Sequence, residues 1–272
     1  MKIAVYIGKK GVETEDRLTG LLCALKEGGC ICYKVDAEEG LLPGTDMVLS
    51  VGGDGTFLSV SKLVADSGVP VLGVNMGRLG FLSENRPEDV ADFLLSGDYD
   101  VEDRALLCAV PVMSNGEQWE EVHALNEVTV HRSGAAVLGV DVCLDGKNLP
   151  TYWADGLIVS TSSGSTAYSL SVGGPIVLPQ SKVLIISPIA PHNLNIRPLV
   201  VPDNSEISLS MQSRDGKCVF TADTMTLELP EDATIKVSLA RFSLRRVRLN
   251  KSDFINALTE KLFWGEDVRN IK

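Results

Sequence analysis

The chain has 272 residues, enough for one large or two ordinary domains, and its 44% hydrophobic and 22% charged residues are typical of a folded globular protein rather than a disordered one. Acidic residues outnumber basic residues by 36 to 25, and the resulting net charge of −11 argues against nucleic acid and acidic membranes as partners. No apolar run approaches the roughly 18 residues that span a bilayer, and no leader precedes the first predicted strand, so we expect a soluble cytoplasmic protein.

The first hundred residues alternate short apolar runs with segments of helical spacing. The predicted strands lie near residues 3–7, 31–35, 47–51 and 70–74, and the predicted helices near residues 14–27, 56–67 and 87–95. Alternation of this kind predicts an α/β domain with a doubly wound parallel sheet.

A glycine turn, Gly52-Gly-Asp-Gly-Thr56, joins the predicted strand 47–51 to the helix that follows it. Backbone N–H groups at a helix start lack partners and attract anions, and glycines let a phosphate come close. Asp54 would repel that phosphate unless it binds a neutralising metal or accepts a proton from an attacking hydroxyl, and both roles belong to phosphoryl transfer. The alternative is that Asp54 only caps the helix and the glycines only form the turn.

A second glycine-rich loop ends the next predicted strand, in Val71-Leu-Gly-Val-Asn-Met-Gly-Arg-Leu-Gly-Phe-Leu82. Two such loops at neighbouring strand ends would form a crevice. Neither is the dinucleotide fingerprint, and no Walker A lysine loop occurs in the chain.

From Val101 onward, strand-like runs alternate with turn signals, which predicts a second, mostly antiparallel β domain. The turn signals are Ser114-Asn-Gly116, Asp145-Gly-Lys147 and Arg214-Asp-Gly-Lys217.

Helical spacing returns at residues 252–263, with Ser252 or Asp253 able to cap the helix and Phe254, Leu258 and Leu262 on one face. We expect this helix to pack back on the first domain. The predicted domains are therefore residues 1–100 with 251–272, and residues 101–250.

A third loop, within Asp155–Pro175, follows a predicted strand at Leu157–Ser160 and is crowded with hydroxyl groups. Hydroxyl groups both donate and accept hydrogen bonds, which suits ribose and amide edges. The alternative is a flexible serine-rich surface loop, against which Tyr168 and the rigid Gly173-Gly-Pro175 argue.

Two groups of residues have mainly structural interpretations. The six cysteines show no zinc-ligand spacing and no histidines at zinc intervals, so we expect reduced, mostly buried thiols and no metal held by the protein.

The arginines and lysine at positions 241, 245, 246, 248 and 251 alternate with apolar residues, which indicates the exposed face of late strands. Contact with a polyanion is the functional alternative.

Taken together, these segments resemble the NAD kinase family, whose enzymes phosphorylate NAD on the 2′-hydroxyl of its adenosine ribose. The matching segments are Gly52–Thr56, Asn75–Leu82, Asn126-Glu127, Asp155-Gly156, Gly164–Tyr168, Gly173–Pro175, Ser187–His192 and Arg197-Pro198. Phosphofructokinase-type sugar kinases and diacylglycerol-kinase-type lipid kinases carry a glycine-aspartate turn similar to the first segment, whereas the full set of segments in this order is specific. The family fold has an N-terminal α/β domain, a C-terminal β domain and a returning helix.

The resemblance implies a role for each matched position. Asp54 would be the catalytic residue, and the phosphate-donor turn would comprise Gly52, Gly53, Gly55 and Thr56. The NAD-binding residues would be Gly55, Phe81, Asn126, Glu127, Asp155, Ser163, Thr166, Ala167, Tyr168 and Ala190. Ser163, Thr166, Ala167 and Tyr168 would form the adenine pocket, and Asp155 and Ala190 would meet the nicotinamide end. Arg78 is a weaker candidate for phosphate contact, with an exposed solubilising arginine as its alternative.

Two segments depart from the family pattern. Thr161-Ser-Ser163 stands where a Thr-Pro-Thr or Thr-Pro-Ser segment is usual, and Asp223-Thr-Met225 stands where Asp-Gly-Gln is usual, which weakens any role for Asp223.

The resemblance also implies ligands and assembly: NAD with ATP or polyphosphate as substrates, Mg²⁺ or another divalent metal brought with ATP, and a homodimer or homotetramer. The alternatives are a lipid or sugar kinase and a non-catalytic dinucleotide sensor.

Overall fold

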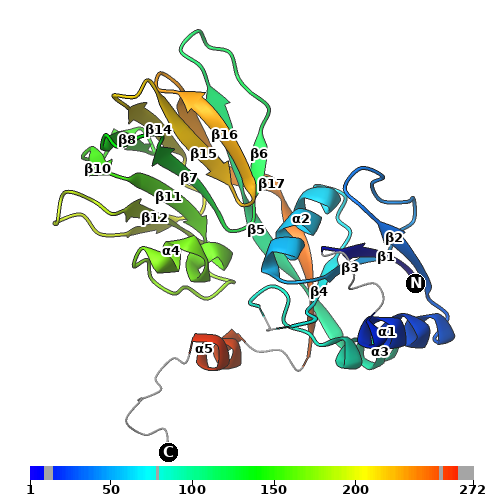
Figure 1. Cartoon of the computed structure of the whole chain (residues 1–272). Coiled ribbons are helices and arrows are strands. Elements are labelled where there is room, and N and C mark those ends of the chain that lie inside the picture. The colour runs from blue at the N-terminus through cyan, green and yellow to red at the C-terminus, as the bar shows by residue number, and fades with distance from the viewer. Residues whose placement is uncertain (9–14, 78–79, 251–253, 263–272) are drawn as a thin grey trace, which may run out of the picture. The chain divides into compact units, whose positions relative to one another are not determined.

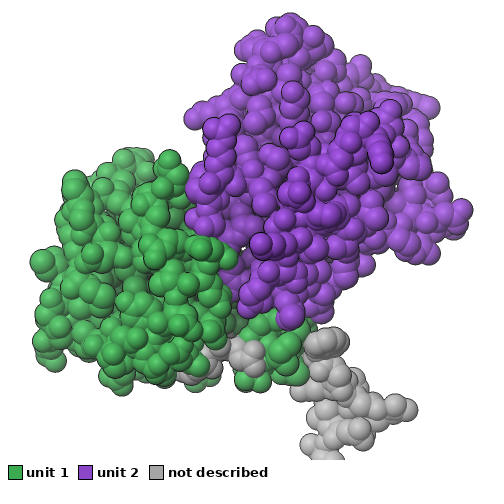
Figure 2. Space-filling view, turned by 180° about the vertical axis from the view of Figure 1, so that it is seen from behind, with its two compact units in different colours: residues 1–103, 244–272 green, residues 104–243 purple. Residues whose placement is uncertain are grey.

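A computed structural model describes residues 1–8, 15–77, 80–250 and 254–262. It divides into two compact units, residues 1–103 with 244–272 (unit 1) and residues 104–243 (unit 2), coloured separately in Figure 2. The corresponding boundaries predicted from the sequence lie at residues 100/101 and 250/251.

Unit 1 contains a parallel sheet with helices on both of its faces (Figure 1). Its elements are β1 (Lys2–Ile7), α1 (Asp16–Glu27), β2 (Ile31–Val35), β3 (Met47–Val51), α2 (Asp54–Val64), β4 (Val71–Val74), α3 (Pro87–Ser96) and α5 (Phe254–Leu262). The strand order is β17-β4-β3-β1-β2, and all four pairings are parallel. The predicted doubly wound α/β domain is therefore confirmed.

The hydrophobic pattern explains this arrangement. Every residue of β3 and β4 is buried, as expected for strands that are covered on both faces. One core cluster joins alternate residues of β1, β3 and β4 to the buried faces of α1 and α3. The buried residues of α2 lie outside that cluster, because α2 covers the opposite face of the sheet.

Unit 2 is an antiparallel β sandwich. Its elements are β6 (Val122–Ala124), β7 (Glu127–Arg132), β8 (Leu138–Leu144), β9 (Lys147–Asn148), β10 (Tyr152–Ala154), β11 (Gly156–Thr161), the 3₁₀ helix η2 (Ser163–Thr166), α4 (Tyr168–Ser171), β12 (Val183–Ile189), β13 (Leu199–Pro202), β14 (Ile207–Gln212), β15 (Lys217–Ala222) and β16 (Met225–Pro230). Strands β5 (Tyr99–Val112) and β17 (Thr234–Leu249) run through both units.

Two layers of strands enclose the core of unit 2. One sheet has the order β13-β12-β11-β7-β15-β16 with every pairing antiparallel, and the other contains β10-β8-β14-β17. A single hydrophobic cluster takes buried residues from both sheets, including Val130, Leu157, Leu209 and Ile235. The predicted antiparallel β domain is confirmed.

The three predicted turns have different outcomes. Asp145 and Gly146 both have positive φ, at 49° and 77°, and connect the paired strands β8 and β9 as a hairpin. The turn at 114–116 lies inside an antiparallel bridge between Val112 and Gln118. The turn at 214–217 is not a hairpin, because it leads from β14 in one sheet to β15 in the other.

The C-terminal helix returns to the first domain, as predicted. Residues 244–272 belong to unit 1, Leu258 is buried, and the Phe254 ring lies 6.1 Å from the ring of Phe81. Ser252 and Asp253, the predicted caps, lie outside the described residues.

The arginine interpretation is partly wrong. Arg241 and Arg245 are exposed, but Arg246 is only 4% exposed and pairs with Glu84, while Arg248 pairs with Asp100. These acidic partners lie more than 140 positions earlier in the chain, so the local alternation could not reveal them.

The cysteines are all free, but only Cys30 and Cys218 are buried, so the expectation of mostly buried thiols is wrong. Within the described ranges, no helix has the length and apolar character needed to cross a membrane.

Candidate functional site

The first glycine turn is the start of α2. Gly53 is the N-cap and Asp54 is the first helical residue, so the alternative in which Asp54 caps the helix is wrong. A Cβ on Gly52, whose φ is +153°, would lie 2.2 Å from Oγ1 of Thr56, so glycine is required there. Gly53 and Gly55 are exposed and have open space where a side chain would stand. A phosphate can therefore approach the backbone at both positions.

The carboxylate of Asp54 joins the two glycine loops. Oδ2 accepts the backbone N–H of Phe81 at 2.9 Å, and Oδ1 accepts the backbone N–H groups of Leu82 at 3.1 Å and Ser83 at 2.9 Å. A Cβ on Gly80 would lie 1.9 Å from Oδ1 of Asp54, so the loop can wrap the carboxylate only with glycine at that position. The two glycine loops therefore lie next to each other in unit 1, as predicted.

The second loop is also anchored to the end of β4. The Asn75 side chain donates to the carbonyl oxygen of Ser83 at 3.2 Å, and the Asn85 side chain donates to that of Gly73 at 2.9 Å. A Cβ on Gly73 would lie 2.5 Å from the carbonyl oxygen of Leu82, so glycine permits this close packing. Arg78, the weaker phosphate candidate, lies outside the described residues.

Lys261 of α5 is a neighbour of this loop that the sequence analysis missed. Its ammonium donates a hydrogen bond to the carbonyl oxygen of Gly80 and lies 4.9 Å from the centre of the Phe81 ring. Burial lowers the pKa of Lys261, and the negative charges of Glu84 and Asp54 oppose that shift. The helical pattern gave no signal for this contact, because Gly80 is 181 positions away.

In unit 2, Asp223 organises the segment that contains Asn126 and Glu127. Its carboxylate accepts the backbone N–H groups of Leu125 at 2.7 Å, Asn126 at 2.9 Å and Glu127 at 3.2 Å. Its own N–H donates to the carbonyl oxygen of Glu127 at 3.0 Å. Asp223 has a φ of +49°, a conformation that Asp and Asn tolerate better than most residues. The carboxylate therefore has a structural role despite the altered motif.

Glu127 carries the most perturbed carboxyl group among these site residues. Burial raises its pKa to about 7, the charge of Asp223 adds to that rise, and the backbone N–H of Tyr168 opposes it. Its Oε2 atom is buried and has no hydrogen-bond partner among the described residues. A buried unpaired oxygen is costly, and a ligand hydroxyl could satisfy it.

The third loop packs directly on the Asn126-Glu127 segment. The Thr161 hydroxyl donates to the carbonyl oxygen of Leu125 at 2.6 Å, and the Thr161 N–H donates to that of Asn126 at 2.9 Å. A Cβ on Gly164 would lie 2.2 Å from the same Asn126 oxygen. Buried hydroxyl groups fill the loop, at positions 160, 161, 162, 165 and 169. The alternative of a flexible surface loop is wrong.

The remaining predicted residues of unit 2 flank this loop. Ser163, Thr166 and Ala167 are partly exposed along η2 and its end, and Tyr168 stacks on His131 with ring centres 5.9 Å apart. Asp155 donates its N–H to the carbonyl oxygen of Ile189, the residue before Ala190, and its carboxylate pairs with Arg132 at 2.8 Å. Ala190 has a φ of +45°. Antiparallel pairing of β7, β11 and β12 thus gathers the predicted unit 2 residues.

A second group of side chains escaped the sequence analysis. Cys108 on β5, His123 on β6 and Glu121 just before β6 approach one another. The spacing of Cys108 and His123, 15 positions apart, matches no zinc motif, so no signal in the sequence indicated this group.

Comparison with known proteins decides the family. Residues 30–96 match the ATP-NAD kinase N-terminal domain, and residues 125–249 match the ATP-NAD kinase C-terminal domain. The chain belongs to the NAD kinase family. The resemblance inferred from the sequence is therefore confirmed.

Individual NAD kinases align over nearly the whole chain. One from Flavobacterium psychrophilum is 39% identical and covers 99% of this chain and 94% of its own. One from Porphyromonas gingivalis strain ATCC 33277 is 43% identical and covers 98% of this chain and 99% of its own.

Two solved structures share the NAD kinase fold of this chain. Yeast NADH kinase complexed with NADH has a TM-score of 0.87 at 25% identity, covering 99% of this chain and 89% of its own. An NAD kinase from Archaeoglobus fulgidus in complex with ATP has a TM-score of 0.77 at 28% identity, covering 92% and 95%.

Proposed function

We propose that this member of the NAD kinase family transfers the terminal phosphoryl group of ATP to the 2′-hydroxyl of the adenosine ribose of NAD, giving NADP. The observation that carries the proposal is the position of Asp54, a carboxylate at the start of α2 between two glycines with open space. Curated relatives named NAD kinase, a structure with NADH and a structure with ATP support the choice of substrates.

The donor phosphates would lie against the first turn of α2. Backbone N–H groups there carry the positive end of the helix dipole, and Gly53 and Gly55 leave the approach clear. Thr56 has a packing role as well, because its side chain fills the space beside Gly8 and Gly52.

Asp54 keeps room for a substrate hydroxyl. A carboxylate offers about four acceptor positions, two on each oxygen. Among the described residues, Oδ1 accepts two backbone N–H groups and Oδ2 accepts one, which leaves one position on Oδ2 for the ribose 2′-hydroxyl. The hydrogen bonds from the second loop fix the orientation of the carboxylate. Positioning therefore contributes more than base strength, as expected for a loose phosphoryl-transfer transition state.

The divalent metal would be bound mainly by the phosphates of ATP. Among the described residues, the one group of three metal-type ligands lies on β5, on β6 and just before β6, not at the glycine turn. The carboxylate of Asp54 would be the protein oxygen ligand nearest the phosphates, and it already accepts hydrogen bonds from three backbone N–H groups. Mg²⁺ commonly binds through one or two carboxylates together with substrate phosphates, and it would supply charge neutralisation for the transfer.

Unit 2 would bind the dinucleotide. Glu127 presents a buried oxygen that lacks a partner among the described residues, as needed to accept a hydrogen bond from a ribose hydroxyl. Asn126 is held beside it by Asp223, and the hydroxyl-rich third loop packs on the same segment. Ser163, Thr166, Ala167 and Tyr168 would line the adenine pocket, and Asp155 and Ala190 would meet the nicotinamide end.

Polyphosphate as an alternative donor, a homodimer or homotetramer, and a cytoplasmic location are further parts of the proposal, which rest on the sequence resemblance. Donor choice is measured by replacing ATP with polyphosphate, and assembly by light scattering of the purified chain.

The deciding assay is formation of NADP from NAD, ATP and Mg²⁺ by the purified chain, followed with a dehydrogenase specific for NADP. A lipid or sugar kinase would leave NAD unchanged and phosphorylate another hydroxyl compound. A non-catalytic sensor would bind NAD in calorimetry without forming NADP. Either result would overturn the proposal.

A further inference from the structure

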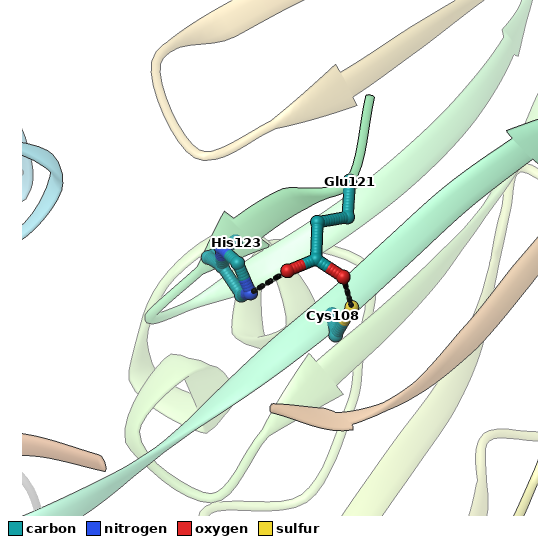
Figure 3. A group of neighbouring side chains, drawn as sticks. All are labelled: Cys108, Glu121 and His123. Carbon is teal, nitrogen blue, oxygen red and sulfur yellow. Dashed lines mark hydrogen bonds and ion pairs between the residues drawn. The ribbon is translucent and has the colours of Figure 1, made fainter. Parts of the chain in front are cut away.

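The antiparallel pairing of β5 and β6 places three side chains of different chemistry together (Figure 3). Cys108 lies directly opposite His123 in the register of the two strands. Glu121 is two positions before His123, and side chains two apart in an extended segment point to the same side. A thiol, a carboxylate and an imidazole therefore face one another across two strands.

The distances between these groups are close to those of a metal site. Glu121 Oε2 lies 3.7 Å from Sγ of Cys108, Glu121 Oε1 lies 3.7 Å from Nε2 of His123, and all three ligand atoms lie within 4.8 Å of one another. A tetrahedral zinc ion with bond lengths of about 2.0–2.3 Å separates its ligand atoms by roughly 3.3–3.6 Å. Small side-chain rotations would close the difference.

We propose that Cys108, Glu121 and His123 bind one Zn²⁺ ion, with a fourth coordination position open to water. Thiolate, imidazole and carboxylate are the three ligand types that zinc uses in proteins, and three protein ligands with one open position form a recognised zinc geometry. The ion can enter from solvent, because the side chains of Glu121 and His123 are 62% and 27% exposed.

This site differs in chemistry from the Mg²⁺ that accompanies ATP. Magnesium takes oxygen ligands in an octahedral arrangement, whereas a thiolate and an imidazole select zinc and similar ions. The proposal therefore adds a second metal to the protein and does not depend on the proposed reaction.

The groups around Cys108 and His123 affect the affinity for Zn²⁺ in opposite directions. Burial, together with the charge of Glu121, raises the pKa of Cys108, and the positive charge of Arg241 opposes that rise. A thiol must lose its proton when a sulfur–zinc bond forms, so Zn²⁺ competes with that proton at Cys108. Arg241 also repels the incoming cation. The ring of Phe242, 4.8 Å from that of His123, limits rotation of the imidazole.

Bound zinc would connect β5 to β6. The pairing of these strands covers only three residue pairs, from Leu107 with Ala124 to Ala109 with Val122. A ligand that binds only the folded chain stabilises it according to its concentration relative to Kd. Zinc should therefore raise the unfolding temperature of the intact chain.

The test uses the full chain, freed of metal with a chelator and kept without nucleotide, and titrated with Co²⁺ as a spectroscopic substitute for Zn²⁺. We expect one equivalent of Co²⁺ to give a sulfur-to-cobalt charge-transfer band with the visible bands of a tetrahedral complex, and Zn²⁺ to abolish both. Calorimetry of Zn²⁺ binding in two buffers should show release of about one proton per ion. Absence of the sulfur band, or its loss on addition of millimolar Mg²⁺, would overturn the proposal.

Variants assign the ligands. Cys108→Ser should remove the charge-transfer band, while Cys143→Ser, which changes another partly exposed cysteine of unit 2, should keep it. Glu121→Gln and His123→Asn should each weaken Zn²⁺ binding by more than the 10–100-fold typical of losing a residue that only hydrogen-bonds to a metal ligand. Glu121 is the most exposed of the three, so the fold and the metal-free activity of its variant should match the parent. Equal Zn²⁺ affinity of the parent and Glu121→Gln would contradict the assignment, as would a sulfur band in Cys108→Ser.

Discussion

The carboxylate of Asp54 accepts the backbone N–H of Ser83, 29 positions later in the chain, at a distance of 2.9 Å. The same oxygen accepts the N–H of Leu82, and the other oxygen accepts that of Phe81. The proposed catalytic group is thus held by the loop after the neighbouring strand. Changes in that loop should therefore alter turnover through Asp54.

Gly80→Ala should lower turnover by about 10–100-fold, because a displacement of the reacting group by about 1 Å can have an effect of that size. The added Cβ would lie 1.9 Å from Oδ1 of Asp54, so the carboxylate must move and lose hydrogen bonds. Gly77→Ala in the same loop is the matched control, since among the described residues its Cβ would meet only Asn75, at 3.8 Å. Steady-state NADP formation measures both variants, and equal rates for the two would contradict this steric account.

Lys261→Met should lower kcat several-fold with little change in the unfolding temperature. The variant keeps the apolar part of the side chain but removes the hydrogen bond to Gly80 and the positive charge over the Phe81 ring. Lys34→Met, on the exposed face of β2, serves as the control. Full activity of the Lys261 variant would show that α5 does not support the loop.

Glu127→Gln should stabilise the protein, and more so at pH 8 than at pH 5. The folded-state pKa of about 7 is above the ordinary glutamate pKa of 4.5, so the unfolded chain binds fewer protons between these values and the free energy of unfolding falls as pH rises through this range. The substitution removes that loss, which is on the order of 1–3 kcal/mol of unfolding free energy.

Thermal or denaturant unfolding at several pH values measures this difference, with Glu206→Gln at an exposed position as the control. The Glu127 variant should also bind NAD more weakly. A pH dependence of stability identical to that of the parent would contradict the raised pKa.

Asp223→Asn should raise the KM for NAD by about tenfold and change kcat less, because uniform binding is lost while the transfer machinery of unit 1 remains. Asparagine tolerates the positive φ of this position, so the backbone should be retained. Its side chain has only one acceptor oxygen, whereas the aspartate holds three N–H groups. An unchanged KM would mean that the Asn126-Glu127 segment is positioned without Asp223.

The sequence predicted the features that depend on local pattern. Five-residue apolar runs followed by glycines placed β3 and the turn before α2, and the Ser/Thr-rich segment after β11 was recognised as part of a site. Motif order then predicted the family. For the strand, the turn and the Ser/Thr-rich segment, the signal lies within about ten neighbouring residues, as propensity and periodicity require.

The features that the sequence did not predict depend on partners far along the chain. The sequence predicted that the two glycine loops lie near each other, but not that Asp54 accepts the N–H groups of residues 81–83, which depends on the register of the parallel strands β3 and β4. The local sequence pattern indicates that Arg246 is a surface residue, but β17 places it beside Glu84. Cys108 and His123 come together only through the register of β5 and β6. A prediction of strand pairing would have been needed for all three.

The most direct test of the central claim compares the parent chain with Asp54→Asn and with the exposed control Asp66→Asn. NADP formation from NAD, ATP and Mg²⁺ and calorimetric NAD binding are measured for each. We predict turnover in the parent and the control, with a loss of about 10²–10⁴-fold in Asp54→Asn while NAD still binds. Full turnover by Asp54→Asn would contradict the assignment of Asp54, and absence of NADP from the parent would contradict the proposed function itself.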